Sequence, residues 1–223
     1  MGIDPRRILY CDDHILVVNK LSGELVVRGK GAVVKLPLLD FLRRQYPGLR
    51  AVHRLDFETS GVVVFARTRE ALQNILSNKF VQWKKMYVTI VTGRPQREGV
   101  IRFSLPARSV KASEERRQVP AVTRYRVLEQ FRDAAFLEVW MEEGGRRHQI
   151  RQHLARIGHP LALDDVYGDR SLNRAFSRSY GYRKFFLHAA SLSFPHPATG
   201  NILTIEAPLP RAFDECLERL QRA

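Results

Sequence analysis

The residues best suited to do chemistry stand together at positions 53–61, which read His-Arg-Leu-Asp-Phe-Glu-Thr-Ser-Gly. This segment places one carboxylate, that of Asp56, between a basic pair and residues that favour a turn. An apolar run at 62–66 follows at once, and its short, β-branched composition is typical of a buried strand. A carboxylate at the end of such a strand is held rigidly and stays reachable from solvent, which suits a catalytic group. An Asp that merely caps a turn beside two solvated bases would have the same local sequence.

Two later segments carry further candidate residues. Residues 85–93 predict a strand on which Tyr87 presents an apolar ring with a polar hydroxyl, although most strand tyrosines are core residues. Residues 145–154 predict a helix on which Arg147 and Arg151 lie one turn apart, beside an apolar stripe. Arg146 and Arg147 have the character of a basic helix face that rests on phosphate groups.

The elements that must position these residues are mostly strands. Strands are predicted at 8–10, 15–18, 86–91, 100–105, 121–128, 135–141, 185–194 and 202–205, and helices at 38–46, 68–80, 147–157 and 211–222. Many strands with few intervening helices favour an α+β fold. We expect a single catalytic domain over residues 1–223, with a largely antiparallel mixed sheet in two lobes, helices on its flanks and an active-site cleft between the lobes. The polar segment 108–118 predicts a mobile loop.

The composition narrows the class of protein. The 37 Lys and Arg residues exceed the 23 Asp and Glu residues, which gives a net charge of +14 and indicates a polyanionic partner. No apolar run approaches the roughly 18 residues of a membrane-spanning helix, and the first residues lack a signal-peptide core. The two cysteines are not paired in a CxxC pattern, and His148 and His153 fall on different faces of their helix, so no metal site is predicted. We therefore expect a cytoplasmic protein that binds no membrane and no metal.

Four segments together resemble the motifs of the RluA-type pseudouridine synthases, in that family's order. They are Asp-Asp-His-Ile-Leu-Val-Val-Asn-Lys at 12–20, His-Arg-Leu-Asp with Thr-Ser-Gly at 53–61, Lys-Met-Tyr at 85–87, and Gly-Arg-Arg-His-Gln-Ile-Arg at 145–151 with Gly-His-Pro at 158–160. The resemblance extends over residues 8–208 and begins so early that no separate amino-terminal RNA-binding domain is expected. It departs from the family at Leu21, where Pro is usual, and at Gln118, where Gly-Lys is frequent.

The resemblance implies an isomerase that converts uridine to pseudouridine in structured RNA. By this analogy Asp56 is the catalytic nucleophile, Tyr87 packs on the target base and is a candidate for handling the C5 proton, and Arg151 pairs with Asp56. The residues expected to contact RNA are His53, Arg54, Lys85, Arg146 and Arg147. The substrate is expected to be a stem-loop uridine of large-subunit rRNA or tRNA, and the protein a monomer.

The implied reaction breaks an N-glycosidic bond, turns the uracil and rejoins it through C5. A carboxylate can attack the sugar C1′ or assist deprotonation, and both routes stay open at this point. Uracil leaves as a resonance-stabilised anion, so no cofactor is predicted. Two alternatives are a non-catalytic RNA-binding protein that retains the fold, and a metal-independent glycosidase or nuclease that uses Asp56.

Overall fold

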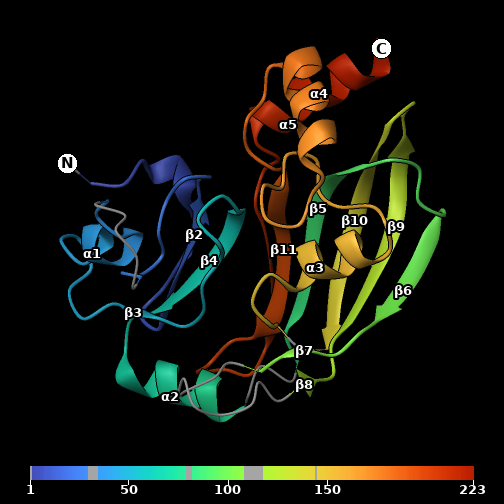
Figure 1. Cartoon of the computed structure of the whole chain (residues 1–223). Helices are drawn as coiled ribbons and strands as arrows, with labels where there is room; N and C mark the ends of the chain where they lie inside the picture. Colours follow the sequence, from blue (N-terminus) through green and yellow to red (C-terminus); the bar gives the residue numbers. More distant parts are fainter. Residues whose placement is uncertain (1, 30–34, 79–81, 108–117, 144) are drawn as a thin grey trace. The chain divides into compact units, whose positions relative to one another are not determined.

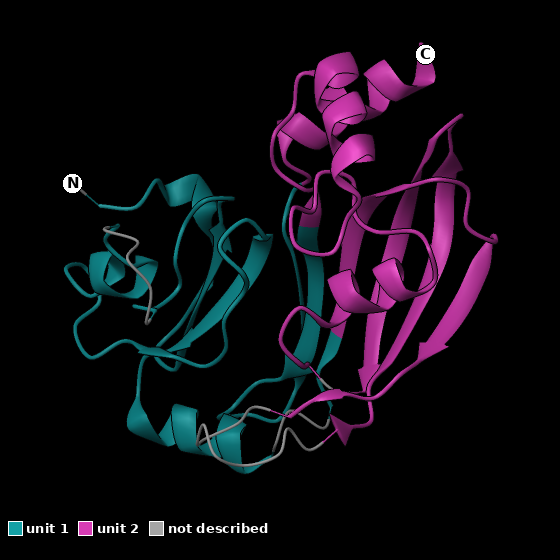
Figure 2. Ribbon diagram, viewed as in Figure 1, with its two compact units in different colours: residues 1–84, 188–208 teal, residues 85–187, 209–223 magenta. Residues whose placement is uncertain are grey.

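The computed structural model describes residues 2–29, 35–78, 82–107, 118–143 and 145–223 (Figure 1). The chain forms two compact units (Figure 2): unit 1 comprises Met1–Lys84 and His188–Pro208, and unit 2 comprises Lys85–Leu187 and Leu209–Ala223. The chain therefore leaves unit 1, builds most of unit 2, returns to unit 1 and ends in unit 2. Apart from Gln118, the predicted mobile loop at 108–118 lies outside the described residues.

Unit 1 is built on strands flanked by short helices. Its elements are the 3₁₀ turn η1 (Pro5–Arg7), strands β1 (Ile8–Cys11), β2 (Ile15–Lys20), β3 (Arg50–Ala51), β4 (Ser60–Ala66), β11 (Leu187–Pro195) and β12 (Ile202–Glu206), and helices α1 (Leu38–Leu42) and α2 (Arg69–Ser77). The pairings β1–β2, β2–β4, β3–β4 and β11–β12 are antiparallel, whereas β4 and β11 run parallel.

Strand β4 is the centre of unit 1. All seven of its residues are buried, which explains why its sequence is a continuous apolar run rather than an alternating one. Val62 and Val64 pack in one cluster with Ile15, Val17 and Phe194. The segment 53–59 leads directly into this rigid strand, as the sequence predicted.

The helices of unit 1 begin where predicted and are shorter than expected. Thr68 caps α2 by accepting a hydrogen bond from the N–H of Ala71 at 3.0 Å. The predicted end of this helix at Phe80 lies outside the described residues. The helix expected at 38–46 stops at Leu42, because the next bonds include tighter i→i+3 links and the following Pro47 disfavours helical backbone before it.

Unit 2 is an antiparallel sheet with one helix laid against it and two more at its end (Figure 1). Its strands are β5 (Lys84–Thr92), β6 (Glu98–Arg102), β9 (Val122–Gln130) and β10 (Ala134–Glu143), in the order β5-β10-β9-β6, with a small pair β7 (Leu105–Pro106) and β8 (Gln118–Val119). Its helices are α3 (Gln149–Arg156), α4 (Arg170–Tyr180) and α5 (Arg211–Gln221). The strand predicted at 100–105 is in fact divided between β6 and β7, and α4 was not predicted.

The predicted α+β class with a largely antiparallel mixed sheet and flanking helices is confirmed. Within the described residues no helix is both long and apolar enough to cross a membrane. The described residues also contain no group of three or more His, Cys, Asp or Glu side chains arranged to hold a metal ion.

Candidate active site

The turn that carries Asp56 lies immediately before β4. Leu55 is buried, Asp56 is partly exposed, and Arg54 is exposed. The N–H of Thr59 donates to the carbonyl oxygen of Asp56 at 3.2 Å and closes the turn. The carboxylate therefore stands on a backbone with a fixed course and remains accessible to solvent, which is the arrangement expected of a catalytic group.

A buried lysine holds this turn from the inside. Lys20, the last residue of β2, is fully buried, and its Nζ donates to the carbonyl oxygens of Leu21 (3.0 Å), Phe57 (3.1 Å) and Thr59. An ammonium group has three N–H donors and no acceptor, so carbonyl oxygens suit it as partners. Lys20 is the last residue of the motif at 12–20, and its sequence context alone predicts no role for it.

The far side of the turn is fixed to β11. The buried ring of His188 donates from Nε2 to the carbonyl oxygen of Ala207 (3.3 Å), so its Nδ1 accepts the hydroxyl of Ser60 (2.9 Å). Burial lowers the pKa of His188 and keeps the ring neutral, although the bond to Ala207 opposes this shift. Gly61 has φ +111°, and a Cβ there would stand 2.2 Å from the carbonyl oxygen of Ala189, so the position requires glycine.

His53 is bound into the structure of unit 1. Its Nε2 accepts the backbone N–H of Val64 at 3.1 Å, and its ring meets Trp83 edge-to-face with centroids 5.5 Å apart. Trp83 in turn packs on Phe194. These contacts give His53 a structural role. Its predicted contact with RNA, like that of the exposed Arg54, stays a prediction.

In unit 2, the other predicted residues are distributed over β5 and the start of α3. Tyr87 lies on β5 opposite Val139 of β10 and is 7% exposed. Lys85, two residues earlier, has its Nζ 3.9 Å from the position a Cβ on Gly145 would occupy. The two motifs at 85–87 and 145–151 are thus neighbours in space.

Helix α3 begins at Gln149 rather than at Arg147, because His148 has left-handed backbone (φ 54°, ψ 30°). Gln149 is buried: its Oε1 accepts the N–H of Arg146 and its Nε2 donates to the carbonyl oxygen of Glu143 at 2.8 Å. This side chain therefore ties the start of the helix to the sheet. A left-handed non-glycine residue is a strained conformation of the kind that gathers at functional sites.

The basic residues around this bend have different surroundings. Arg147 is exposed and its Nε donates to His148 Nε2 at 3.5 Å, while Nδ1 of His148 bonds the Tyr167 hydroxyl at 3.1 Å. The Nε of Arg146 is buried and has no hydrogen-bond partner among the described residues. An unpaired buried donor costs free energy until a ligand satisfies it.

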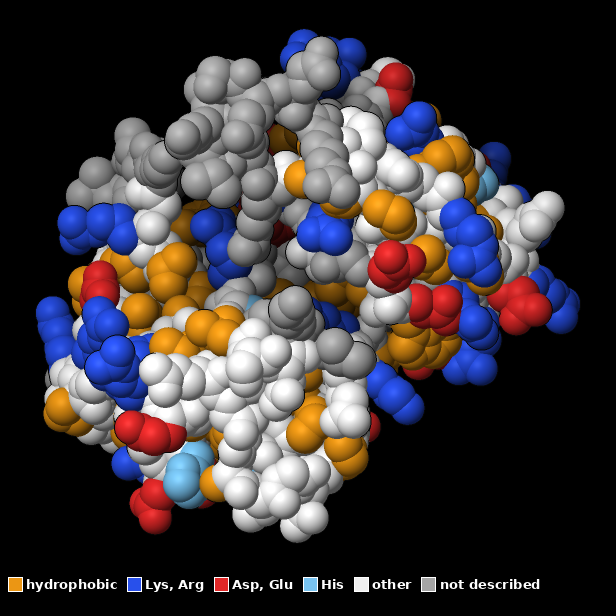
Figure 3. Space-filling view, turned by 90° about the horizontal axis from the view of Figure 1, so that it is seen from below, with side chains coloured by type: hydrophobic (Ala, Val, Ile, Leu, Met, Phe, Trp, Pro, Cys, Tyr) orange, Lys and Arg blue, Asp and Glu red, His pale blue; other side chains and the backbone are white. Residues whose placement is uncertain are grey.

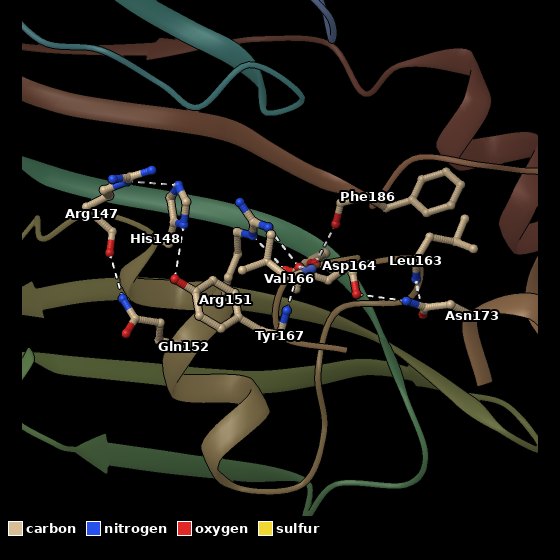
Figure 4. A network of polar contacts seen from close by, with 11 residues as sticks. Arg147, His148, Arg151, Gln152, Leu163, Asp164, Val166, Tyr167, Asn173 and Phe186 are labelled. Atoms are coloured by element: carbon tan, nitrogen blue, oxygen red, sulfur yellow. Dashed lines mark hydrogen bonds and ion pairs between the residues drawn. The ribbon is translucent and has the colours of Figure 1, made fainter. Parts of the chain in front are cut away.

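Arg151 is held by a buried carboxylate that sequence reasoning missed (Figure 4). Its Nε and Nη2 donate to the two carboxylate oxygens of Asp164 at 2.6 and 2.7 Å. The guanidinium also stacks on aromatic rings, 4.4 Å from the centroid of Phe185 and 5.2 Å from that of Tyr167. Both charges are almost completely buried, so this two-point pair fixes the direction of the guanidinium.

Asp164 also organises the loop that contains it. Its Oδ1 accepts the N–H groups of Val166 and Tyr167, both at 3.0 Å. Burial alone would raise the pKa of Asp164, but the bonds from Arg151 and from these N–H groups outweigh burial and hold the pKa below its ordinary value. Asn173 of α4 completes the network, since its side chain bonds both the Leu163 N–H and the Asp164 carbonyl oxygen.

Sequence reasoning therefore found the segments and missed two of the residues that fix them. The sequence shows Asp164 and Asp165 side by side, and nothing local indicates that the first is buried and the second exposed. Asp164 does follow an apolar run, which is the one available signal. Predicted residues His53, Arg54 and Asp56 belong to unit 1, and Lys85, Tyr87, Arg146, Arg147 and Arg151 to unit 2. The predicted pairing of Arg151 with Asp56 stays a prediction.

Comparison with known proteins identifies the class. Residues 14–156 match the sequence model of the family described as RNA pseudouridylate synthase. The chain belongs to this family and to its RluA type, and it is an isomerase that converts uridine to pseudouridine in RNA. The resemblance noted in the motifs is confirmed.

The particular relatives are bacterial enzymes named for the large ribosomal subunit. The chain is 39% identical over 231 residues to ribosomal large subunit pseudouridine synthase C of Escherichia coli (strain K12), covering 97% of this chain and 70% of the relative. The protein of the same name from Vibrio cholerae is 37% identical over 223 residues, with 97% and 70% covered.

Solved structures agree with this assignment. Human RNA pseudouridylate synthase domain containing 4 superposes with a TM-score of 0.78 at 28% identity, covering 97% of this chain and 93% of that one. Human RNA pseudouridylate synthase domain containing 1 has a TM-score of 0.72 at 22% identity, covering 100% and 98%, and supports the fold alone.

Proposed function

We propose that this enzyme modifies uridines of large-subunit ribosomal RNA, with Asp56 as its catalytic carboxylate. The observation that carries the choice of RNA is the 37–39% identity, over 97% of the chain, to enzymes named ribosomal large subunit pseudouridine synthase C. The choice of Asp56 rests on its motif and on its position on a fixed turn with a partly exposed side chain.

In the proposed reaction the Asp56 carboxylate attacks C1′ of the uridine. The N1–C1′ bond breaks and its electron pair leaves with the uracil, which is stabilised as an anion. After the uracil turns, C5 attacks C1′, the bond between the carboxylate and C1′ breaks, and the product loses its C5 proton while N1 gains one. The reaction is an isomerisation, so it needs no external oxidant, reductant or cofactor.

Two residues of unit 2 complete the proposed catalytic set. Tyr87 packs on the target uracil, to which its ring supplies an apolar face, and is the candidate for handling the C5 proton. Arg151 acts as the partner that keeps Asp56 ionised and directed. The bond of Arg151 to Asp164 supports this role, because a guanidinium with a fixed direction pairs with a second carboxylate at little cost in conformational entropy.

RNA contacts are proposed for His53, Arg54, Lys85, Arg146 and Arg147. The target uridine must leave its stack, which costs a few kcal/mol that protein contacts have to offset. Arg54 is exposed beside the catalytic turn, and the unpartnered Nε of Arg146 is a donor that a phosphate oxygen would satisfy. Basic side chains are also spread over the face drawn in Figure 3, several of them beside acidic ones. The proposal includes one catalytic domain formed by the whole chain, a monomeric state and a cytoplasmic location.

Tritium release from C5-labelled uridine tests the choice of RNA. Wild-type protein is incubated with unmodified large-subunit rRNA and, separately, with unmodified tRNA. Release from rRNA and none from tRNA is expected, and release from tRNA alone would overturn the proposed substrate. Chromatography for free uracil and a denaturing gel for shortened RNA serve as controls, because a glycosidase or nuclease would produce one or the other.

A further inference from the structure

Helix α4 carries a line of arginines that form no ion pair with any described residue. Arg170, Arg174 and Arg178 recur every four residues, so they follow one side of the helix at a spacing of about 6 Å along its axis. All three are exposed, and no carboxylate of the described chain lies within ion-pair distance of them. Asp165 and Asp169 are acidic residues at the amino-terminal end of this segment, and Asp169 lies near enough to Arg174 for the two charges to interact.

This line of arginines faces away from the protein. Phe176, the buried residue of α4, is two positions from Arg174 and from Arg178, which places it about 200° around the axis from each. The residues that follow the arginines, Ser171, Ala175 and Ser179, are small and exposed. One flank of the line of arginines is therefore formed by small residues, which leave room beside it for a phosphate backbone.

Several other exposed arginines of unit 2 are already paired with carboxylates, whereas α4 carries in one line three arginines that are unpaired within the described chain. On the sheet, Arg124 and Arg126 are paired with Glu142 and Glu138 at 2.6 Å. On α5, Arg211 and Arg222 are paired with Glu215 and Glu218 one turn away. An arginine already paired within the protein gains less from a phosphate than one that is not, because its existing ion pair must first be given up.

Helix α4 is also fixed in place rather than loosely attached. Asp169 caps its first turn, Gly181 ends it with φ +80°, and Asn173 bonds the loop that contains Asp164 at 2.7 and 2.9 Å. A contact made on α4 is therefore connected through one rigid network to the loop that orients Arg151 (Figure 4).

We propose that the face of α4 formed by Arg170, Arg174 and Arg178 is a docking surface for the phosphate backbone of the substrate RNA, away from the uridine that reacts. The proposal rests on the enzyme's action on RNA and adds a second point of contact. Phosphate contacts of this kind position an RNA without reading its sequence. The surface thus increases affinity for large structured RNA and takes no part in the chemical step.

The test compares two triple variants with the same change of net charge. One is Arg170→Gln, Arg174→Gln, Arg178→Gln. The control is Arg126→Gln, Arg211→Gln, Arg222→Gln, which removes three exposed but ion-paired arginines. Glutamine is close to arginine in helix propensity, so α4 is retained. Affinity for a long fragment of large-subunit rRNA is measured by filter binding between about 50 and 200 mM salt.

For the α4 variant we expect affinity to fall about tenfold or more and the slope of log affinity against log salt to decrease by about 2–3, whereas the control changes affinity less than threefold. In the α4 variant we also expect KM to be higher than in the wild type and kcat to be unchanged. Replacing the same three arginines with lysine should restore affinity, because charge is kept.

Wild-type affinity in the α4 variant, or equal losses in both variants, would overturn the proposal. Absence of tritium release by the wild type from every RNA would instead count against the proposed function, and the filter-binding comparison would still decide the role of α4.

Discussion

The turn that carries Asp56 and the loop that orients Arg151 are both held from inside by one buried charge, but the two charges have opposite sign. In unit 1 the ammonium of Lys20 gathers backbone carbonyl oxygens. In unit 2 the carboxylate of Asp164 gathers backbone N–H groups together with the guanidinium of Arg151. The backbone around Lys20 presents carbonyl oxygens to the positive charge, and the backbone around Asp164 presents N–H groups to the negative charge.

The difference lies in what each charge holds. The bonds of Lys20 to Leu21, Phe57 and Thr59 all end on backbone carbonyl oxygens, and they fix the turn while the Asp56 side chain stays partly exposed for a substrate. Asp164 fixes backbone and a catalytic candidate at once, and both members of that pair are buried. Removal of Asp164 should therefore cost more than removal of Lys20, since it takes a two-point carboxylate contact away from the buried Arg151 guanidinium.

The largest effect on stability is predicted for Asp164→Asn. The substitution leaves the Arg151 guanidinium buried with a neutral partner, and we expect the free energy of unfolding to fall by about 3–5 kcal/mol. The free energy of unfolding is measured by urea titration, with circular dichroism as the signal. The exposed neighbour Asp165→Asn is the matched control and should change stability by less than about 0.5 kcal/mol. Equal effects in the two variants would contradict the assigned role of Asp164.

A smaller loss is predicted for Lys20→Met, which keeps the length of the side chain and removes the ammonium. The carbonyl oxygens of the Asp56 turn lose the ammonium as a donor. The carbonyl oxygen of Phe57 keeps one hydrogen bond, because it still accepts the N–H of Gly23 at 2.8 Å. We expect a loss of about 2–3 kcal/mol in the same titration. Turnover per folded molecule should also fall because the turn is less well fixed. Lys84→Met, at an exposed position of β5, is the control, and a loss no greater than the control's would show that Lys20 does not hold the turn.

The smallest predicted effect is on the pH dependence of stability. Its measurement tests whether the neutral ring of His188 supports the Asp56 turn. Burial depresses its folded-state pKa, so its contribution to stability is complete above the unfolded pKa of about 6.5 and is lost as pH falls below it, by at most about 1.4 kcal/mol per pH unit. His188→Gln should flatten the decline in stability between about pH 6.5 and 5. Part of the slope should remain, because burial also lowers the pKa of His153. An unchanged slope in the variant would mean that folding does not shift the pKa of His188, against the proposed neutral, buried ring.

The sequence predicted the elements whose signal is local. The run at 62–66 predicted β4, and Thr68 predicted the start of α2, because burial on both faces and a capping hydroxyl each leave a direct pattern. Helix α4 is strongly amphipathic but buries a single residue, Phe176, so its periodicity comes from polar and basic residues rather than from the apolar stripe by which helices are predicted. Its cap at Asp169 and its terminal Gly181 were present as signals.

The site was predicted in part for a similar reason. Motif residues such as Asp56, Tyr87 and Arg151 follow from the resemblance, whereas Asp164 and Lys20 act through contacts with segments distant in the sequence. The bond from Lys20 to Phe57 spans 37 positions, and no periodicity or spacing reports such a contact. Long-range polar contacts of buried charges are therefore the part of this site that required the structure.

The most direct test of the account compares the two carboxylates in one assay, tritium release from C5-labelled rRNA by Asp56→Asn and by Asp164→Asn, each corrected for the folded fraction. We predict that Asp56→Asn folds and binds RNA as the wild type does and releases no tritium, because the group that reacts with the sugar is gone. Asp164→Asn should be unstable yet retain measurable release, because it only positions Arg151. Wild-type release by Asp56→Asn would contradict the central claim that Asp56 performs the chemistry.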